Sequence, residues 1–198
     1  MKIKSISLAL VLFISSQGNA QSAKADLPSM APLEQYLMSD RNAEIALART
    51  AAPESISGNA EILILTRRGF ETAVKGTNGF VCMVARSWSA YSEDPDFWNP
   101  KLRVPICYNA VAARSQVPVT MKRTEVVLAG GSKARFFDAI KAAIESRELP
   151  TAEPGAVAYM LSRQGYLNDH VGHWLPHLMF YTPQTDPKVG ALAYPARP

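Results

Sequence analysis

The sequence predicts an α+β fold, in which an antiparallel sheet of about five strands carries helices packed on one face. Short apolar runs bounded by turn residues occur together in the first half of the chain, which is typical of neighbouring strands. Stretches with helical periodicity occur together after them. The hydrophobic content of 47% is ordinary for a globular protein and excludes a wholly disordered chain.

The first predicted element is a helix over residues 31–51. Apolar residues recur there at a spacing near 3.6, Ser29 is placed to cap the first turn, and Pro53 stops the helix. Three strands are predicted next, because each apolar run lies beside residues that favour turns. They cover residues 61–66, 70–75 and 80–86, and Asn78-Gly79, a pair that tolerates positive φ, lies between the last two.

The middle of the chain has weaker patterns. Residues 88–105 show no periodicity, and Phe97 and Trp98 favour an ordered loop, because large aromatics left unpacked would promote aggregation. Residues 108–114 are expected to form one or two helical turns. Residues 119–129 fit a strand or a helix, and we favour a helix.

The clearest helix lies in the second half of the chain. Ser132 is placed to cap residues 133–148, where Phe136, Ile140 and Ile144 share one face. Two strands complete the predicted sheet, and they cover residues 155–162 and 177–181.

The first 20 residues have the pattern of a secretory signal peptide. Lys2 and Lys4 precede an apolar stretch from Ile6 to Ile14, and Gly18-Asn19-Ala20 supplies small residues for cleavage. This stretch is shorter than the roughly 18 residues that span a bilayer, and no later segment is long and apolar enough to do so. We therefore expect a soluble protein that begins near Gln21 and is exported, either periplasmic or secreted.

Removal of the signal changes the charge of the chain. It takes two lysines from the 21 basic residues and none of the 17 acidic ones, so the formal net charge falls from +4 to +2. No cluster of Lys and Arg remains, which argues against a nucleic-acid partner. The remaining chain divides into a flexible lead-in (21–30), a single globular domain (31–183) and a Pro-rich extended tail (184–198).

The two cysteines, Cys82 and Cys107, are expected to form a disulfide. Both lie in apolar surroundings, and an exported protein matures where disulfides persist. Closing a loop of this length would stabilise the fold by about 3 kcal/mol through the entropy of the unfolded chain. Two buried free thiols are the alternative.

All three histidines lie in one segment, as His170, His173 and His177. Three neutral imidazoles can hold zinc and leave a fourth position open. If the segment is a strand, however, His173 and His177 stand about 13 Å apart, so a shared metal requires a turn. The alternative is that His177 is a hydrogen-bonded residue at a strand end and His170 a loop residue.

A cysteine hydrolase is a second hypothesis for the same segment. Such enzymes place the nucleophile at a helix N-terminus and its histidine on a strand. Cys107 is followed by residues expected to be helical, and His173 or His177 would be the base. A disulfide between the two cysteines would remove this nucleophile.

Five other side chains are candidates for binding a small ligand. Arg86 and Arg163 would recognise a carboxylate or phosphate, while Trp98 and Trp174 would line a pocket. Asp169 lies beside the first histidine. Core packing is the alternative for the tryptophans, and a surface ion pair is the alternative for the arginines.

Three stretches carry a resemblance: Arg86-Ser87-Trp88, Phe97-Trp98-Asn99-Pro100 and the run from Gly172 to Tyr181. Together with the strand that holds a cysteine, they resemble a group of exported bacterial proteins over most of the mature chain. The resemblance implies export and no particular reaction, cofactor or partner. The order of elements also resembles ligand-sensing folds of the PAS/profilin type, and a fold by itself does not define a function.

The sequence therefore predicts an exported protein that binds a small molecule or a metal, zinc in particular, near His170–His177. The cysteine hydrolase is the enzymatic alternative. A non-enzymatic interaction protein of the cell envelope is the third hypothesis.

Overall fold

The computed structural model describes residues 27–90, 94–168 and 172–182, and within them six strands form one sheet in the order β2-β1-β3-β4-β5-β6. The strands β1 and β3 are parallel, and the other neighbouring pairs are antiparallel. The predicted α+β class is confirmed, with six strands where about five were expected. The strands are β1 (Glu61–Thr66), β2 (Gly69–Val74), β3 (Val81–Ala85), β4 (Val104–Tyr108), β5 (Ala156–Met160) and β6 (His177–Tyr181).

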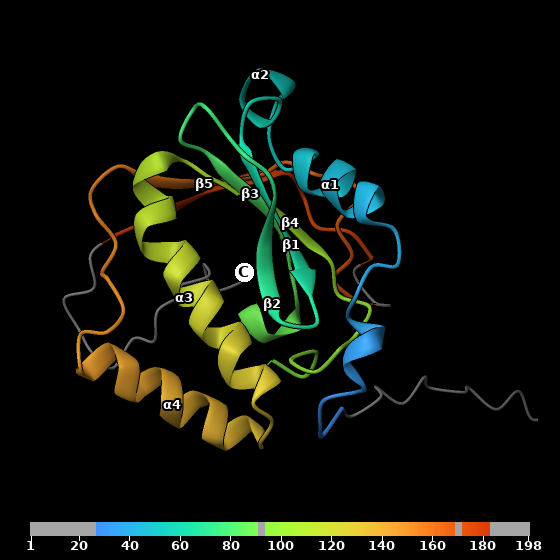
Figure 1. Ribbon diagram of the computed structural model, residues 1–198, viewed down its shortest axis with the longest axis vertical. Helices are drawn as coiled ribbons and strands as arrows, with labels where there is room; N and C mark the ends of the chain where they lie inside the picture. Colours follow the sequence, from blue (N-terminus) through green and yellow to red (C-terminus); the bar gives the residue numbers. More distant parts are fainter. Residues whose placement is uncertain (1–26, 91–93, 169–171, 183–198) are drawn as a thin grey trace, which may run out of the picture.

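Helices cover both faces of the sheet, which differs from the single covered face that the sequence predicted (Figure 1). In β1, Ile62 and Ile64 pack with Ala48 of α1, whereas Leu63 and Leu65 belong to the cluster that includes Val127 of α3. A strand buried on both faces is apolar throughout and does not alternate, so its sequence does not reveal two layers of helix. The helical elements are η1 (Leu33–Gln35), α1 (Arg41–Arg49), α2 (Glu54–Ser57), η2 (Ser87–Ser89), α3 (Ala110–Leu128) and α4 (Lys133–Glu145).

The first predicted helix is in fact two elements, η1 and α1. Asp40 starts α1, because its carboxylate accepts hydrogen bonds from the backbone N–H groups of Asn42 and Ala43. Between the two elements, Tyr36 is fully buried and its hydroxyl donates to the backbone oxygen of Trp98 at 2.7 Å. Tertiary packing therefore interrupts a segment that has helical periodicity.

The turn around Asn78-Gly79 does not form a hairpin between β2 and β3, because β1 lies between these strands. Instead the segment crosses the start of β1. The backbone N–H of Thr77 donates to the oxygen of Asn59 at 2.9 Å, and that of Glu61 donates to the oxygen of Phe80 at 2.8 Å. Gly79 has the positive φ, +78°, that the sequence predicted for this turn.

Strand β4 lies where the sequence predicted the end of a loop. It contains Pro105, which is unusual inside a sheet because proline lacks the N–H that a ladder needs. Backbone N–H groups alternate in direction along a strand, so Pro105 occupies a position whose N–H would face β5, as does Cys107, which pairs there with Tyr159. Pairing with β5 covers only Cys107 and Tyr108, so no ladder bond is lost at Pro105.

The long helix α3 replaces the short helical turns and the ambiguous segment of the prediction. Asn109 caps it by accepting from the backbone N–H of Ala112 at 2.8 Å. Pro118 lies inside the helix and leaves the backbone oxygen of Arg114 without its usual helical donor. The predicted helix at 133–148 is observed as α4, with Phe136 and Ile140 buried and Ile144 partly buried, as expected.

The disulfide between Cys82 and Cys107 is confirmed. The two residues face each other in the register of β3 and β4, and both are fully buried. This pairing joins the two central strands, so that β2, β1 and β3 lie on one side of the bond and β4, β5 and β6 on the other.

The predicted signal peptide (1–20), most of the lead-in and the tail (184–198) lie outside the described residues. Within the described ranges, no helix has the length and apolar character needed to cross a membrane.

Candidate functional site

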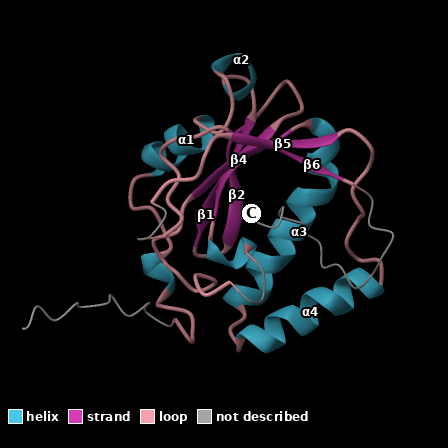
Figure 2. Ribbon diagram, turned by 180° about the vertical axis from the view of Figure 1, so that it is seen from behind, coloured by secondary structure: helices cyan, strands magenta, loops and turns pink. Residues whose placement is uncertain are grey.

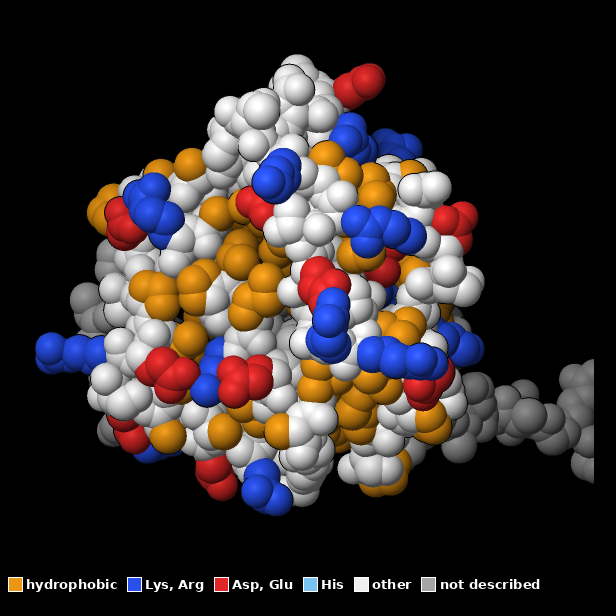
Figure 3. All heavy atoms as spheres, in the orientation of Figure 1, with side chains coloured by type: hydrophobic (Ala, Val, Ile, Leu, Met, Phe, Trp, Pro, Cys, Tyr) orange, Lys and Arg blue, Asp and Glu red, His pale blue; other side chains and the backbone are white. Residues whose placement is uncertain are grey.

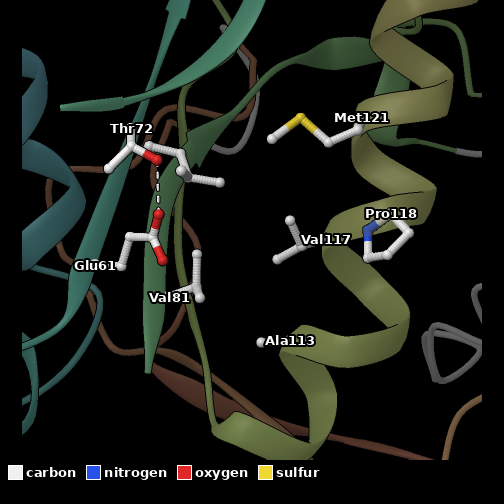
Figure 4. Close-up of a pocket in the computed structure, with 8 residues that line it drawn as sticks. Glu61, Thr72, Val81, Ala113, Val117, Pro118 and Met121 are labelled. Carbon is white, nitrogen blue, oxygen red and sulfur yellow. Dashed lines mark hydrogen bonds between the residues drawn. The ribbon is translucent and has the colours of Figure 1, made fainter. Parts of the chain in front are cut away.

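A pocket lies between α3 and the sheet, and its shape follows from two patterns of spacing (Figure 4). Ala113, Val117 and Met121 are four residues apart, so they share the face of α3 that points to the sheet. The opposite wall comes from alternate residues of the strands, which share one face of a sheet. The pocket has a volume of about 300 Å³ and is lined by Glu61, Leu63, Thr72, Val81, Ala113, Val117, Pro118 and Met121.

The polar part of this pocket is a single carboxylate held by a hydroxyl. Thr72 Oγ1 donates to Glu61 Oε1 at 2.7 Å, and both side chains appear in the wall opposite α3 (Figure 4). A bulge brings them together, because the register of β1 and β2 shifts between Ile62 and Leu63 and places Thr72 opposite Leu63. Among the described residues, Thr72 is the one side chain that donates to this carboxylate.

The rest of the lining is apolar. Pro118 adds its ring to the pocket at the point where α3 lacks a backbone donor, and the small side chain of Ala113 leaves room beside Val117. In the space-filling view, apolar side chains gather over the region between α3 and β2 (Figure 3). An apolar cavity with a few fixed polar groups is the usual form of a small-molecule site, and typical volumes begin near about 300 Å³.

Arg86, one of the five predicted ligand-binding residues, lies in the interior. It is fully buried, and its Nη2 forms an ion pair with Glu44 Oε1 at 2.8 Å. Its Nε donates to the oxygen of Tyr36 at 2.7 Å, and its Nη1 donates to the oxygen of Val84. Burial is the main influence on the pKa of Arg86 and lowers it, while the charge of Glu44 acts in the opposite direction. Arg86 therefore ties β3 to α1 and to the segment before it.

Arg103 lies near this buried pair. Burial and the positive charge of Arg86 lower its pKa to about 10. Its guanidinium donates to the backbone oxygens of Pro100 and Leu102 and, at 3.3 Å, of Gln35. The two arginines thus hold loop backbone in place around one carboxylate.

The two predicted tryptophans are buried, with exposed fractions of 3% for Trp98 and 8% for Trp174. Neither indole N–H has a hydrogen-bond partner among the described residues. Trp98 contacts Phe97 at 4.6 Å between ring centroids, and Trp174 lies against Gly165, where an added Cβ would come within 3.4 Å of the indole. Arg163 is exposed.

In the described part of the histidine segment, two imidazoles are held in the same way, each with Nδ1 beside a backbone oxygen. His173 Nδ1 lies 2.6 Å from the backbone oxygen of Gly165, and His177 Nδ1 lies 2.7 Å from that of Leu175. A carbonyl oxygen only accepts, so Nδ1 carries the proton in both rings and Nε2 is left as the acceptor when the ring is neutral. Within the described ranges, no group of three His, Cys, Asp or Glu residues is placed to hold a metal. Asp169 and His170 lie outside these ranges.

The arrangement expected for a cysteine hydrolase is absent from the site. Cys107 lies in β4, not at a helix N-terminus, and α3 begins after Asn109. Its sulfur is bonded to Cys82, and the chain has no free cysteine. No thiolate is available to attack a substrate.

Of the predicted candidates that the structure describes, Trp174 and His177 are in contact, with 5.9 Å between their ring centroids. The α3 pocket uses none of them, and the sequence signals for its residues were present but incomplete. The four-residue spacing of Ala113, Val117 and Met121 is visible in the sequence. The pairing of Glu61 with Thr72 depends on the bulge and on the position of α3, which local patterns do not determine.

Comparison of the chain with family models, with curated proteins and with solved structures gave no match.

Proposed function

We propose that this protein binds a small molecule with an apolar body and a cationic or hydrogen-bond-donating group in the pocket between α3 and the sheet. The observation that carries the proposal is the Glu61 carboxylate, oriented by Thr72 at the wall of an otherwise apolar pocket. A protonated amine would satisfy this carboxylate with a charge-assisted hydrogen bond. Ala113, Val117 and Met121 would cover the apolar part of the ligand.

Three six-carbon probes test the proposed chemistry, because their apolar chains are nearly equal in length and their polar groups differ in charge. Hexylamine is expected to bind more tightly than hexanol, and hexanoate least, because its charge repels Glu61. Isothermal titration calorimetry would give the order of affinities. An order in which hexanoate binds best would contradict a role for the carboxylate.

The matched variants are Glu61→Gln and Glu71→Gln. Both remove a carboxylate from the hairpin of β1 and β2, but Glu71 lies outside the pocket, where it pairs with Arg68. Glu61→Gln should remove the preference for the amine, and Glu71→Gln should keep it. The larger side chain of Ala113→Leu should fill the pocket and weaken the binding of all three probes. Equal effects of the two Gln variants would refute the assignment of the site.

Zinc binding at the histidine segment is a second candidate function, and the orientation of two imidazoles favours it. Metal-ligating histidines usually donate their other ring N–H to a carbonyl or carboxylate, as His173 and His177 do in donating Nδ1–H to backbone oxygens. His170 would supply a third ligand. A calorimetric zinc titration of the wild type beside His173→Ala tests this. If the heat of zinc binding is the same in the wild type and in His173→Ala, zinc binding at the histidine segment is excluded.

We propose that the protein works outside the cytoplasm. The buried disulfide between Cys82 and Cys107 supports this location, since such bonds persist in oxidising compartments. The signal pattern of residues 1–20 adds independent support. Mass spectrometry of the purified mature protein should show a chain that begins near Gln21, and a chain that keeps residues 1–20 would contradict export by cleavage.

A further inference from the structure

Strand β6 forms one edge of the sheet and carries an unusual concentration of exposed apolar side chains. The large hydrophobic residues that are exposed in the described parts of the chain are Leu175, Leu178 and Phe180, with exposed fractions of 85%, 43% and 71%. Within those parts, β6 has a single neighbouring strand, β5 (Figure 2). An open edge with apolar side chains is a template for pairing with another strand.

The hydrogen-bonding direction of this edge follows from the neighbouring ladder. The N–H of Asn109 donates to the oxygen of Val157 at 2.9 Å, so Val157 and, two residues on, Tyr159 direct their backbone groups to β4. The alternate residue Ala158 therefore directs its backbone groups to its partner Met179 in β6. Along β6 the direction alternates again, so Leu178 and Phe180 present their N–H and C=O groups at the outer edge.

The side chains of these same two residues lie on one face. Leu178 is opposite Tyr159, which is opposite Cys107, and Cys107 packs in the cluster of the α1 face. Phe180 is opposite Val157 on that face. Helix α1 contacts β1, β3 and β4 on this face of the sheet. The part of the face formed by β5 and β6 lies beyond the area that α1 covers (Figure 2).

We propose that two copies of the protein pair along β6, antiparallel and about a two-fold axis at Met179. In this register Leu178 of each copy faces Phe180 of the other, and Met179 faces its own counterpart. The two Leu178–Phe180 pairs would each exchange two backbone hydrogen bonds, four in all, because both residues point their backbone groups outward. The strand is thus complementary to itself, as a two-fold interface requires.

The side chains fit the same register. Leu178 of one copy would contact Phe180 of the other across the axis, and these contacts would continue the apolar strip of Val157 and Tyr159 from one sheet into the next. Taking an aromatic side chain as about 200 Å², the 71% exposed Phe180 offers roughly 140 Å². With Leu178 and the strand backbones, we estimate roughly 700 Å² buried in total, below the roughly 1,200 Å² of a standard interface. The dimer is therefore expected to be weak and concentration-dependent.

Sedimentation velocity over a range from about 1 μM to 1 mM would test the proposal, because weak interfaces have dissociation constants in this range. The wild type should shift from monomer to dimer. Phe180→Lys should shift the midpoint to at least about tenfold higher concentration, because it places like charges near the axis. Leu175→Lys is the matched control, since it adds the same charge at an exposed leucine outside β6 (His177–Tyr181). Circular dichroism would confirm that both variants remain folded.

The register has its own test. The chain has no free cysteine, so Met179→Cys would introduce a single thiol. Residues that face each other across a two-fold axis in a non-hydrogen-bonded pair are close enough to form a disulfide, so mild oxidation should give a covalent dimer. Leu175→Cys should not. A wild type that stays monomeric throughout, or a dimer that Phe180→Lys leaves unchanged, would overturn the proposal and favour an extended peptide of another protein as the partner of β6. A dimer without the Met179 cross-link would overturn the register.

Discussion

Replacing Glu44 by glutamine should destabilise the protein strongly, because it leaves the buried Arg86 guanidinium without a counter-charge. Glu44 is 1% exposed and Arg86 is fully buried, and one carboxylate oxygen, Oε1, accepts from both Arg86 Nη2 at 2.8 Å and the N–H of Leu65 at 3.1 Å. Breaking a buried ion pair by removing one partner typically costs about 3–5 kcal/mol. For a chain of this size, such a loss lowers the melting temperature by about 10 °C.

Urea unfolding at 25 °C, followed by circular dichroism, measures this change in the free energy of unfolding. Glu153→Gln is the matched control: Arg114 and Glu153 form an ion pair with the same distance, 2.8 Å, but both side chains are exposed. It should have little effect, and that effect should shrink further in high salt. The double variant Glu44→Leu with Arg86→Met removes both charges and should recover part of the loss.

A loss below about 1 kcal/mol for Glu44→Gln would refute this account of Arg86. It would mean that water or a conformational change compensates the charge, and that Arg86 is accessible enough to serve as a ligand-binding residue. The measured value therefore separates the structural role of Arg86 from the binding role that the sequence suggested.

Three further predictions concern the disulfide, α4 and a buried tyrosine. Replacing Cys82 and Cys107 together by serine should lower the free energy of unfolding by about 3 kcal/mol, and thiol labelling of the unreduced, denatured wild type should find no free sulfhydryl. Ile140→Asp should cost about 3 kcal/mol, since Ile140 is 7% exposed, and an unchanged melting temperature would contradict its inward orientation. Burial raises the pKa of Tyr108, so the unfolded chain loses this proton first and stability should fall as the pH rises above about 10. Tyr108→Phe should flatten that decline in urea-unfolding measurements between pH 8 and 11, and an equally steep decline would exclude Tyr108 as its source.

Much of the fold was predictable because local patterns and tertiary packing agree. The hairpin of β1 and β2, the helix α4 and the strand β6 each combine clear periodicity with turn or capping residues, and their predicted positions hold to within a few residues. Strand β4 was missed because it is buried on both faces, so its residues do not alternate, and because Pro105 argues against a strand despite the strand-favouring Val104, Ile106 and Tyr108.

The candidate site was less predictable than the fold. Its apolar wall belongs to α3, whose continuity is concealed by Pro118, and its carboxylate is positioned by a bulge in a pair of strands. The three histidines are close in the sequence, and this spacing predicted a shared metal site. Closeness in sequence does not determine convergence in space, and for His173 and His177 the local hydrogen bonds to Gly165 and Leu175 define the ring positions.

The position of the disulfide has a consequence for how the molecule opens. The bond between Cys82 and Cys107 crosses the middle of the sheet, with the α3 pocket formed by strands on one side and the β6 edge on the other. Partial unfolding that releases β5 and β6 would leave the strand wall of the pocket attached to β4. Amide hydrogen exchange is therefore expected to be slowest in β3 and β4 beside the bond. On either side of them, β5 with β6 and β1 with β2 should each exchange as a separate group.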